Sequence, residues 1–174
     1  IFHDDNTERV GAKKYTIEET DSKILRDMLL IDADGGAGTR SDLRIPVLRE
    51  YVGICRKYEK ASVLELKNSM TPDAIAGIVS EIRKEGWLEN VIFISFAHEN
   101  LVELRRLLPE AKLQFLTMDA ANEKMLPLLE PWGLDLDIYY PALTKAGLEL
   151  MHEHGIEVNC WTVDEPADAG RLAE

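Results

Sequence analysis

The chain has 174 residues, of which 45% are hydrophobic, so it can bury one sizeable core and a single globular domain is expected. Asp and Glu number 32 against 20 Lys and Arg, which gives a formal net charge of −12. Because nucleic acids and anionic membranes are bound by clustered Lys and Arg, this charge argues against both as partners. The sequence has no apolar run long enough to span a membrane and no visible signal peptide.

The two cysteines, Cys55 and Cys160, lie far apart and lack the spacing of metal ligands. We interpret both as reduced, structural residues. They do not settle the cellular compartment.

The first residues, Ile1 to Asp5, carry an imidazole and two carboxylates, His3, Asp4 and Asp5, where a short apolar strand would end. The stretch that follows, about residues 10–44, is polar and rich in Asp and Gly, and we predict a loop insertion there. Its segment Asp34 to Gly38 has the glycines of a phosphate cradle. It lacks the Lys-Ser/Thr pair that should follow, so a flexible loop is favoured.

Beyond this stretch, apolar strand patterns alternate with amphipathic helical patterns. Pro72 behind Thr71 indicates a helix start, Pro109 ends the next helix, and Gly86 and Gly155 fit helix stops. The patterns predict strands over 63–67, 91–96, 113–116, 136–140 and 156–163, and helices over 71–85, 101–108 and 144–154.

Apolar strands that are each followed by a helix indicate a parallel sheet covered by helices, either doubly wound or closed as a (β/α)₈ barrel. Periodicity does not choose between the two. The polar or aromatic residues Glu65, Lys67, Ser95 and Trp161 fall at the carboxyl ends of predicted strands. Active sites of barrels are assembled at these ends, which favours the barrel.

Six motifs, in order along the chain, resemble those of the glycerophosphodiester phosphodiesterase family. Any one of them is weak, but six in sequence are specific. They are His3-Asp4 with Arg9 behind it, Thr16-Ile17-Glu18-Glu19, Ile45-Pro46-Val47-Leu48-Arg49-Glu50, Glu65-Leu66-Lys67, Ser95-Phe96 and Trp161-Thr162-Val163.

The chain also departs from the family pattern. Family members open with a strand carrying a His-Arg pair and a second carrying a Glu-x-Asp pair, and they close with a strand ending in Thr-Asp; none of these is found here. The resemblance therefore implies a TIM-type (β/α)₈ barrel present as an incomplete chain, with residues 1–174 forming one partial barrel domain.

The resemblance also implies roles for individual residues. Phosphodiester cleavage needs charge neutralisation on the non-bridging oxygens, a base for the attacking hydroxyl or water and an acid for the leaving alkoxide. Glu65 would be one of three carboxylates that hold Ca²⁺ or Mg²⁺, with Lys67 beside it binding the phosphate. His3 would be one of two catalytic histidines. Trp161, and more weakly Phe96, would line the substrate pocket against the glycerol moiety.

Each residue also has a simpler interpretation. His3 alone would be a surface histidine, and Trp161 a core residue. Glu65 and Lys67 could be a plain ion pair of little energetic value if exposed. Two opposite charges inside an apolar strand are, however, expensive to bury without a purpose.

We therefore expect a metal-dependent hydrolase that converts a small-molecule glycerophosphodiester into glycerol 3-phosphate and an alcohol. One alternative is a catalytically inactive barrel module that binds phosphoesters or acts as a scaffold. Another is a related barrel enzyme acting on phosphoinositides or sphingolipids, which the motifs Glu65-Leu66-Lys67 and Trp161-Thr162-Val163 disfavour. The chain by itself is expected to be weak or inactive, because Glu65 alone cannot hold a cation that prefers six or more oxygens. The leaving alcohol and the oligomeric state are not readable from the sequence.

Overall fold

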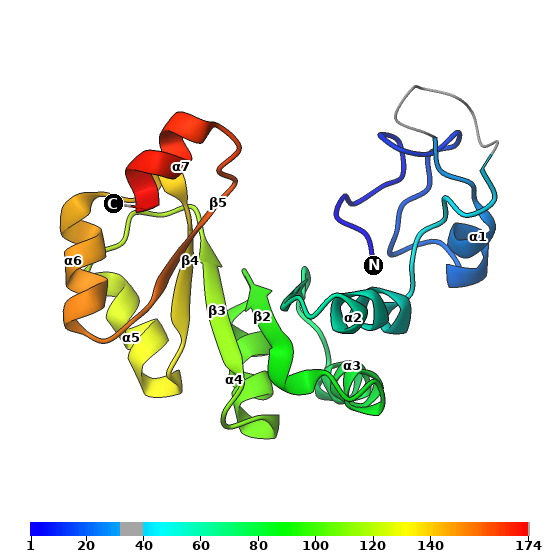
Figure 1. Cartoon of the computed structure of the whole chain (residues 1–174). Helices are drawn as coiled ribbons and strands as arrows, with labels where there is room; N and C mark the ends of the chain where they lie inside the picture. The colour runs from blue at the N-terminus through cyan, green and yellow to red at the C-terminus, as the bar shows by residue number, and fades with distance from the viewer. Residues whose placement is uncertain (32–39, 174) are drawn as a thin grey trace. The chain divides into compact units, whose positions relative to one another are not determined.

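The computed structural model describes residues 1–31 and 40–173, and these divide into two units, Ile1–Tyr58 and Glu59–Glu174. Figure 1 draws both, and each is described by itself. The Gly-rich segment 34–38 lies outside the described residues. The expectation of one partial barrel domain over 1–174 stays a prediction.

The first unit consists mainly of loops held together by a few polar contacts. Isolated antiparallel bridges join Asn6 to Thr16 and Gly11 to Leu30. The fully buried Thr7 donates its hydroxyl to the Lys13 carbonyl oxygen at 2.6 Å and accepts the Tyr15 backbone N–H at 2.9 Å. Because a buried hydroxyl must find partners, Thr7 fixes the turn that surrounds it.

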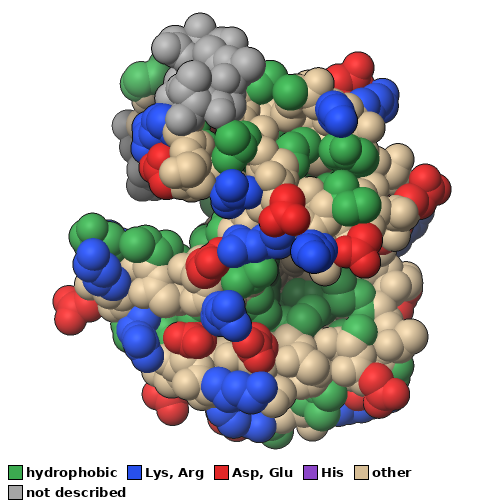
Figure 2. All heavy atoms as spheres, turned by 90° about the vertical axis from the view of Figure 1, so that its right-hand side faces the viewer, with side chains coloured by type: hydrophobic (Ala, Val, Ile, Leu, Met, Phe, Trp, Pro, Cys, Tyr) green, Lys and Arg blue, Asp and Glu red, His purple; other side chains and the backbone are tan. Residues whose placement is uncertain are grey.

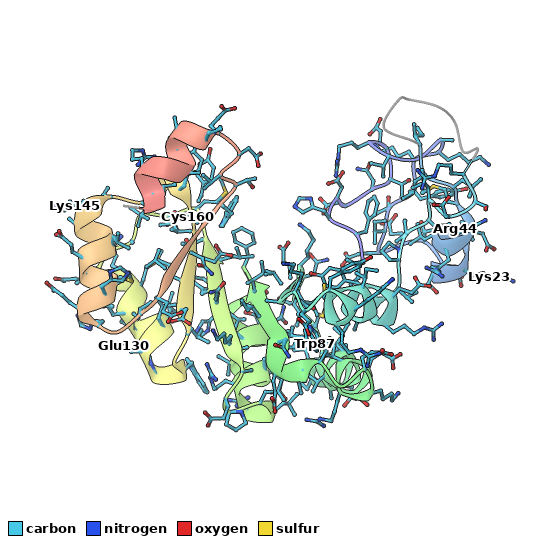
Figure 3. The ribbon with its side chains drawn as sticks, viewed as in Figure 1. Lys23, Arg44, Trp87, Glu130, Lys145 and Cys160 are labelled. Atoms are coloured by element: carbon cyan, nitrogen blue, oxygen red, sulfur yellow. The ribbon has the colours of Figure 1, made fainter. Side chains whose placement is uncertain are left out.

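Two helices in this unit were not predicted from the sequence. Helix α1 (Ser22–Asp27) lies within the stretch predicted as a loop, and the Asp21 carboxylate caps it by accepting the Lys23 N–H at 2.8 Å. At the other end of α1, the Arg44 guanidinium donates to the carbonyl oxygens of Arg26 and Asp27 (Figure 3). Helix α2 (Leu48–Lys57) begins where the Glu50 carboxylate accepts the Val47 N–H at 2.9 Å.

The second unit is a parallel sheet of five strands in the order β1-β2-β3-β4-β5. The strands are β1 (Ser62–Glu65), β2 (Val91–Ser95), β3 (Lys112–Thr117), β4 (Asp135–Tyr139) and β5 (Val158–Trp161). The helices are α3 (Pro72–Lys84), α4 (His98–Leu107), α5 (Leu126–Leu129), α6 (Lys145–Glu153) and α7 (Pro166–Ala173), with 3₁₀ turns at Leu88–Asn90, Glu123–Met125, Glu130–Trp132 and Tyr140–Ala142.

All five predicted strands are present with small shifts at their ends, and so are the three helices predicted for this part of the chain. Thr71 caps α3 by accepting the Ala74 N–H, and Pro72 occupies the first turn. Gly86 and Gly155 follow α3 and α6 with φ of 65° and 71°, a left-handed conformation that glycine adopts without strain. Helices α5 and α7 were not predicted.

The two faces of the sheet differ in composition. One face presents a set of almost completely buried apolar side chains, which form the core of the unit: Leu64, Phe93, Leu113, Leu136 and Ile138. Because side chains alternate along a strand, the residues between them point to the opposite face, which we call the polar face because it carries the charged side chains Glu65, Asp135 and Asp137 among apolar ones. This arrangement is a curled half-barrel, consistent with an incomplete (β/α) barrel (Figure 1).

Within the described residues, no helix is both long and apolar enough to cross a membrane. On the face that Figure 2 draws, acidic and basic side chains are interspersed.

Candidate functional site

Glu65 and Lys67 lie together at the carboxyl end of β1. The Lys67 ammonium nitrogen is 3.6 Å from a Glu65 carboxylate oxygen. The Lys67 side chain is 34% exposed and the Glu65 side chain 20%. Leu64 and Leu66, which alternate with them, are buried on the helix-covered face. Glu65 and Lys67 therefore project from the opposite face, as their alternation in the sequence predicts.

A buried polar cluster fixes the backbone that carries Lys67. Asn100, at the start of α4, is fully buried; its amide group donates to the Asn68 carbonyl oxygen at 2.8 Å and accepts the Met70 N–H at 2.9 Å. The Ser95 hydroxyl, at the end of β2, donates to the Leu66 carbonyl oxygen at 2.5 Å. We call Asn100 and Ser95 the loop clamp, because they hold both ends of segment 66–70.

Aromatic side chains gather at the carboxyl ends of β2, β4 and β5. The rings of Phe96 and Trp161 meet edge to face with centroids 5.8 Å apart, and Tyr139 lies 5.3 Å from Trp161. The Trp161 indole N–H donates to the Asp137 carbonyl oxygen at 3.2 Å, which fixes the ring against β4. Phe96 and Tyr139 are exposed, at 45% and 36%, so this cluster presents apolar surface to a ligand.

Asp137 occupies the middle of β4 on the polar face, two residues before Tyr139. It is only 7% exposed, and within residues 1–31 and 40–173 its carboxylate accepts no hydrogen bond, although its oxygen atoms are not sealed from solvent. Burial, and then the negative charge of Glu65, raise the pKa of Asp137 to about 6. A carboxylate in this condition is costly to keep ionised and ready to accept a donor.

His3, in the first unit, belongs to a short polar chain. Its Nδ1 lies 2.9 Å from an Asp4 carboxylate oxygen, and the Arg9 guanidinium donates two hydrogen bonds to the same carboxylate, at 2.7 and 3.0 Å. The Arg9 bonds, and then the contact with His3, hold the pKa of Asp4 well below its usual range. The ionised Asp4 therefore favours a proton on Nδ1 and leaves Nε2 of the largely exposed His3 ring available.

The predicted site residues thus form three groups. Glu65 is paired with Lys67, Phe96 contacts Trp161, and His3 has its own partners in the first unit. Sequence reasoning missed Asp137 and Tyr139, although a carboxylate inside an apolar strand is the same signal that identified Glu65. It also missed Asn100, whose contacts join segments about 30 residues apart.

Within the described part of the chain, no group of three or more His, Cys, Asp or Glu side chains gathers in a way that could hold a metal ion. Glu65 is a hard oxygen donor of the kind that Ca²⁺ and Mg²⁺ prefer. These residues therefore fit part of a coordination shell and do not complete one.

A parallel half-barrel with charged and aromatic side chains at the carboxyl ends of its strands is the architecture of a (β/α)-barrel enzyme. The model of the glycerophosphoryl diester phosphodiesterase family matches residues 1–174. The chain belongs to this family, and so to a class of enzymes that hydrolyse phosphodiesters.

Curated relatives cover nearly the whole chain at low identity. The uncharacterised protein YqiK of Bacillus subtilis is 24% identical over 181 residues, which are 100% of this chain and 72% of YqiK. The glycerophosphodiester phosphodiesterase of Caldanaerobacter subterraneus subsp. tengcongensis is 23% identical over 187 residues, which are 99% of this chain and 71% of the relative.

Solved structures share the fold. A putative glycerophosphoryl diester phosphodiesterase of Silicibacter pomeroyi matches with a TM-score of 0.77 at 18% identity, over 99% of this chain and 71% of that one. An Oleispira antarctica phosphodiesterase, in complex with the product sn-glycerol-3-phosphate, matches with a TM-score of 0.75 at 21% identity. The match covers 99% of this chain and 70% of that one.

Proposed function

We propose that this chain carries part of the active site of an enzyme that hydrolyses glycerophosphodiesters to glycerol 3-phosphate and an alcohol. The observation that carries the proposal is the family match over residues 1–174. The product-bound structure of the Oleispira antarctica phosphodiesterase supports it, because glycerol 3-phosphate is the product expected here.

The proposed reaction needs two proton transfers, one from the attacking water and one to the leaving alcohol oxygen. The oxygen of a water molecule attacks phosphorus, the bond from phosphorus to the alcohol oxygen breaks, and the water proton passes to a base while an acid protonates the departing alkoxide. We assign one of these proton transfers to His3, through Nε2. Asp4 supports this role because its carboxylate, held by Arg9, orients the imidazole.

Charge neutralisation is assigned to Lys67 and to a divalent cation, Ca²⁺ or Mg²⁺, with Glu65 as one ligand. A bound dication would stabilise the negative charge that develops on the phosphoryl oxygens. Lys67 contributes a fixed positive charge beside Glu65, and segment 66–70 behind it is held by the loop clamp. Trp161 and Phe96 would provide the apolar wall of the substrate pocket.

The test, made on the protein that carries this chain, is release of glycerol 3-phosphate from glycerophosphocholine and glycerophosphoethanolamine with Ca²⁺, with Mg²⁺ and with a chelator. We expect metal-dependent release that falls by about 100-fold or more in His3→Ala, the usual size of a lost acid or base. A fall is also expected in Glu65→Ala, because it would remove one ligand of the cation. Glu149→Ala is the matched control, because Glu149 forms only an exposed ion pair with Lys145 on α6.

Two outcomes would contradict the proposal. Release that survives His3→Ala would exclude His3 from the proton transfers. Specific binding of glycerophosphodiesters without any turnover, by the protein that carries this chain, would support the inactive binding module instead.

A further inference from the structure

Asp137 is a buried carboxylate of the polar face, and the proposed chemistry gives it no role. Leu116 and Asn159 are its register partners on β3 and β5, so it lies inside the sheet and not at its margin. Buried carboxylates in folded proteins are hydrogen-bonded or paired, because an unpaired one costs several kcal/mol. The missing partner of Asp137 must therefore be accounted for.

Two of the neighbouring donors are already occupied, and within the described residues the amide of the exposed Asn159, the register partner on β5, makes no hydrogen bond with Asp137. The Trp161 indole N–H is bonded to the main-chain oxygen of Asp137 and not to its carboxylate, and the Lys67 ammonium lies beside Glu65. Leu116, the register partner on β3, has no polar atom to offer. The charge of Glu65 repels that of Asp137, so it opposes ionisation where a partner would favour it.

The rings beside Asp137 indicate what kind of ligand would supply the donor. Tyr139 follows Asp137 on the same strand face, and Trp161 is the register partner of Tyr139 on β5, with Phe96 against it. Aromatic rings pack against C–H groups, and a carboxylate accepts strong hydrogen bonds from hydroxyl groups. A small polyol presents both kinds of surface.

We propose that Asp137 is a specificity-determining residue that accepts hydrogen bonds from the hydroxyl groups of the glycerol moiety, whose C–H groups lie against the rings of Trp161, Tyr139 and Phe96. This inference rests on the proposed function, because it names what the same site recognises. A site built to bond hydroxyl groups rejects ligands that lack them, since its buried acceptor is then left unpaired.

Binding, and not turnover, gives the sharpest test. The dissociation constants of glycerol 3-phosphate and of n-propyl phosphate, which lacks both hydroxyls, are measured by calorimetry at fixed Ca²⁺ on the protein that carries this chain. We expect the wild type to favour glycerol 3-phosphate by about 10- to 100-fold, the range for hydrogen bonds to a charged group.

Variants of Asp137 show how much of this binding preference depends on its carboxylate. In Asp137→Ala the ratio of the two dissociation constants should fall to near one, with n-propyl phosphate bound as before. Asp137→Asn should keep part of the preference, because its amide oxygen still accepts. Asp135→Asn is the matched control on the same strand: its carboxylate already accepts the Glu157 N–H at 3.0 Å, so the ratio should not change.

The remaining outcomes all count against the inference. Equal binding of the two phosphates by the wild type, or a preference that survives Asp137→Ala, would overturn it while leaving the proposed function intact. Weaker Ca²⁺ binding in Asp137→Ala with an unchanged ratio would make Asp137 a metal ligand instead. A wild type that binds neither phosphate would overturn the proposed function as well.

Discussion

A buried carboxylate without a donor destabilises the folded chain whenever it is ionised, and Asp137 is such a group. Its pKa is about 6 in the folded state against the ordinary value of 3.8. Below pH 3.8 both states are protonated and there is no cost. The cost grows as pH rises toward 6 and is complete above it, where about 2 pKa units correspond to about 3 kcal/mol.

Asp137→Asn should therefore stabilise the ligand-free protein in a pH-dependent way. Urea unfolding at pH 8 should show a gain in the free energy of unfolding of up to about 3 kcal/mol, and the gain should shrink toward zero near pH 4. Asp119→Asn, which removes an exposed charge, controls for the change in net charge. A gain of the same size at both pH values would mean that ionisation of Asp137 is not the cause.

At the scale of elements, the loop clamp is the contact most sensitive to a single change. Asn100→Ala would leave the Met70 N–H and the Asn68 carbonyl oxygen without the partners they have now. Each unsatisfied buried group costs about 1–3 kcal/mol, so we expect a loss of about 3 kcal/mol in the free energy of unfolding.

Hydrogen exchange gives a local readout for the same variant. The Met70 amide should exchange slowly in the wild type and much faster in Asn100→Ala, while amides in the middle of β3 keep their protection relative to global stability. Asn122→Ala removes an exposed cap of the 3₁₀ turn at Glu123–Met125 and should cost less. Equal losses in both variants would show that burial of the clamp adds nothing.

The elements differ in how far the sequence predicts them. Strands β1 to β5 were predictable because each is a compact apolar run, and α3 because Thr71 and Pro72 mark its start. Helix α2 was missed because it follows Val47, whose side chain makes no capping hydrogen bond. The loop clamp could not be predicted from the sequence, because the hydrogen bond between Asn100 and Met70 depends on how β1 and α4 are packed against each other.

In the candidate site, too, contacts set by local alternation were predictable and contacts set by the fold were not. Glu65 and Lys67 were predicted to share a face, and period-two alternation alone places them there. The closeness of Phe96 to Trp161 depends on the order β2-β3-β4-β5, which periodicity cannot supply. Asp137 could have been noticed as a carboxylate inside an apolar strand, but its lack of a hydrogen-bond donor within the described chain depends on the fold and leaves no mark in the sequence.

At the scale of the whole molecule, the net charge of −12 should affect how fast substrates arrive. A strongly acidic surface repels an anion over a distance of about one Debye length, which salt shortens. Between about 10 and 150 mM NaCl, we expect kcat/KM to rise a few-fold for glycerophosphoglycerol, which is an anion. The zwitterionic glycerophosphocholine, of no net charge, should hardly respond. A fall for the anion would mean that the local charge of Lys67 outweighs the global field.

The loop clamp also dictates the length of the chain between β1 and α3. Leu66, Asn68 and Met70 each bond to Ser95 or Asn100 through backbone atoms, so one inserted or deleted residue would put these atoms out of register. Within the described residues, the exposed segment 118–120 after β3 is held only by near neighbours: the Thr117 hydroxyl accepts the Asp119 N–H, and the Asn122 amide donates to the Ala120 carbonyl oxygen. Among related proteins, insertions and deletions that alter the site should therefore be found in the loop after β3. The segment beside Lys67 should keep a constant length.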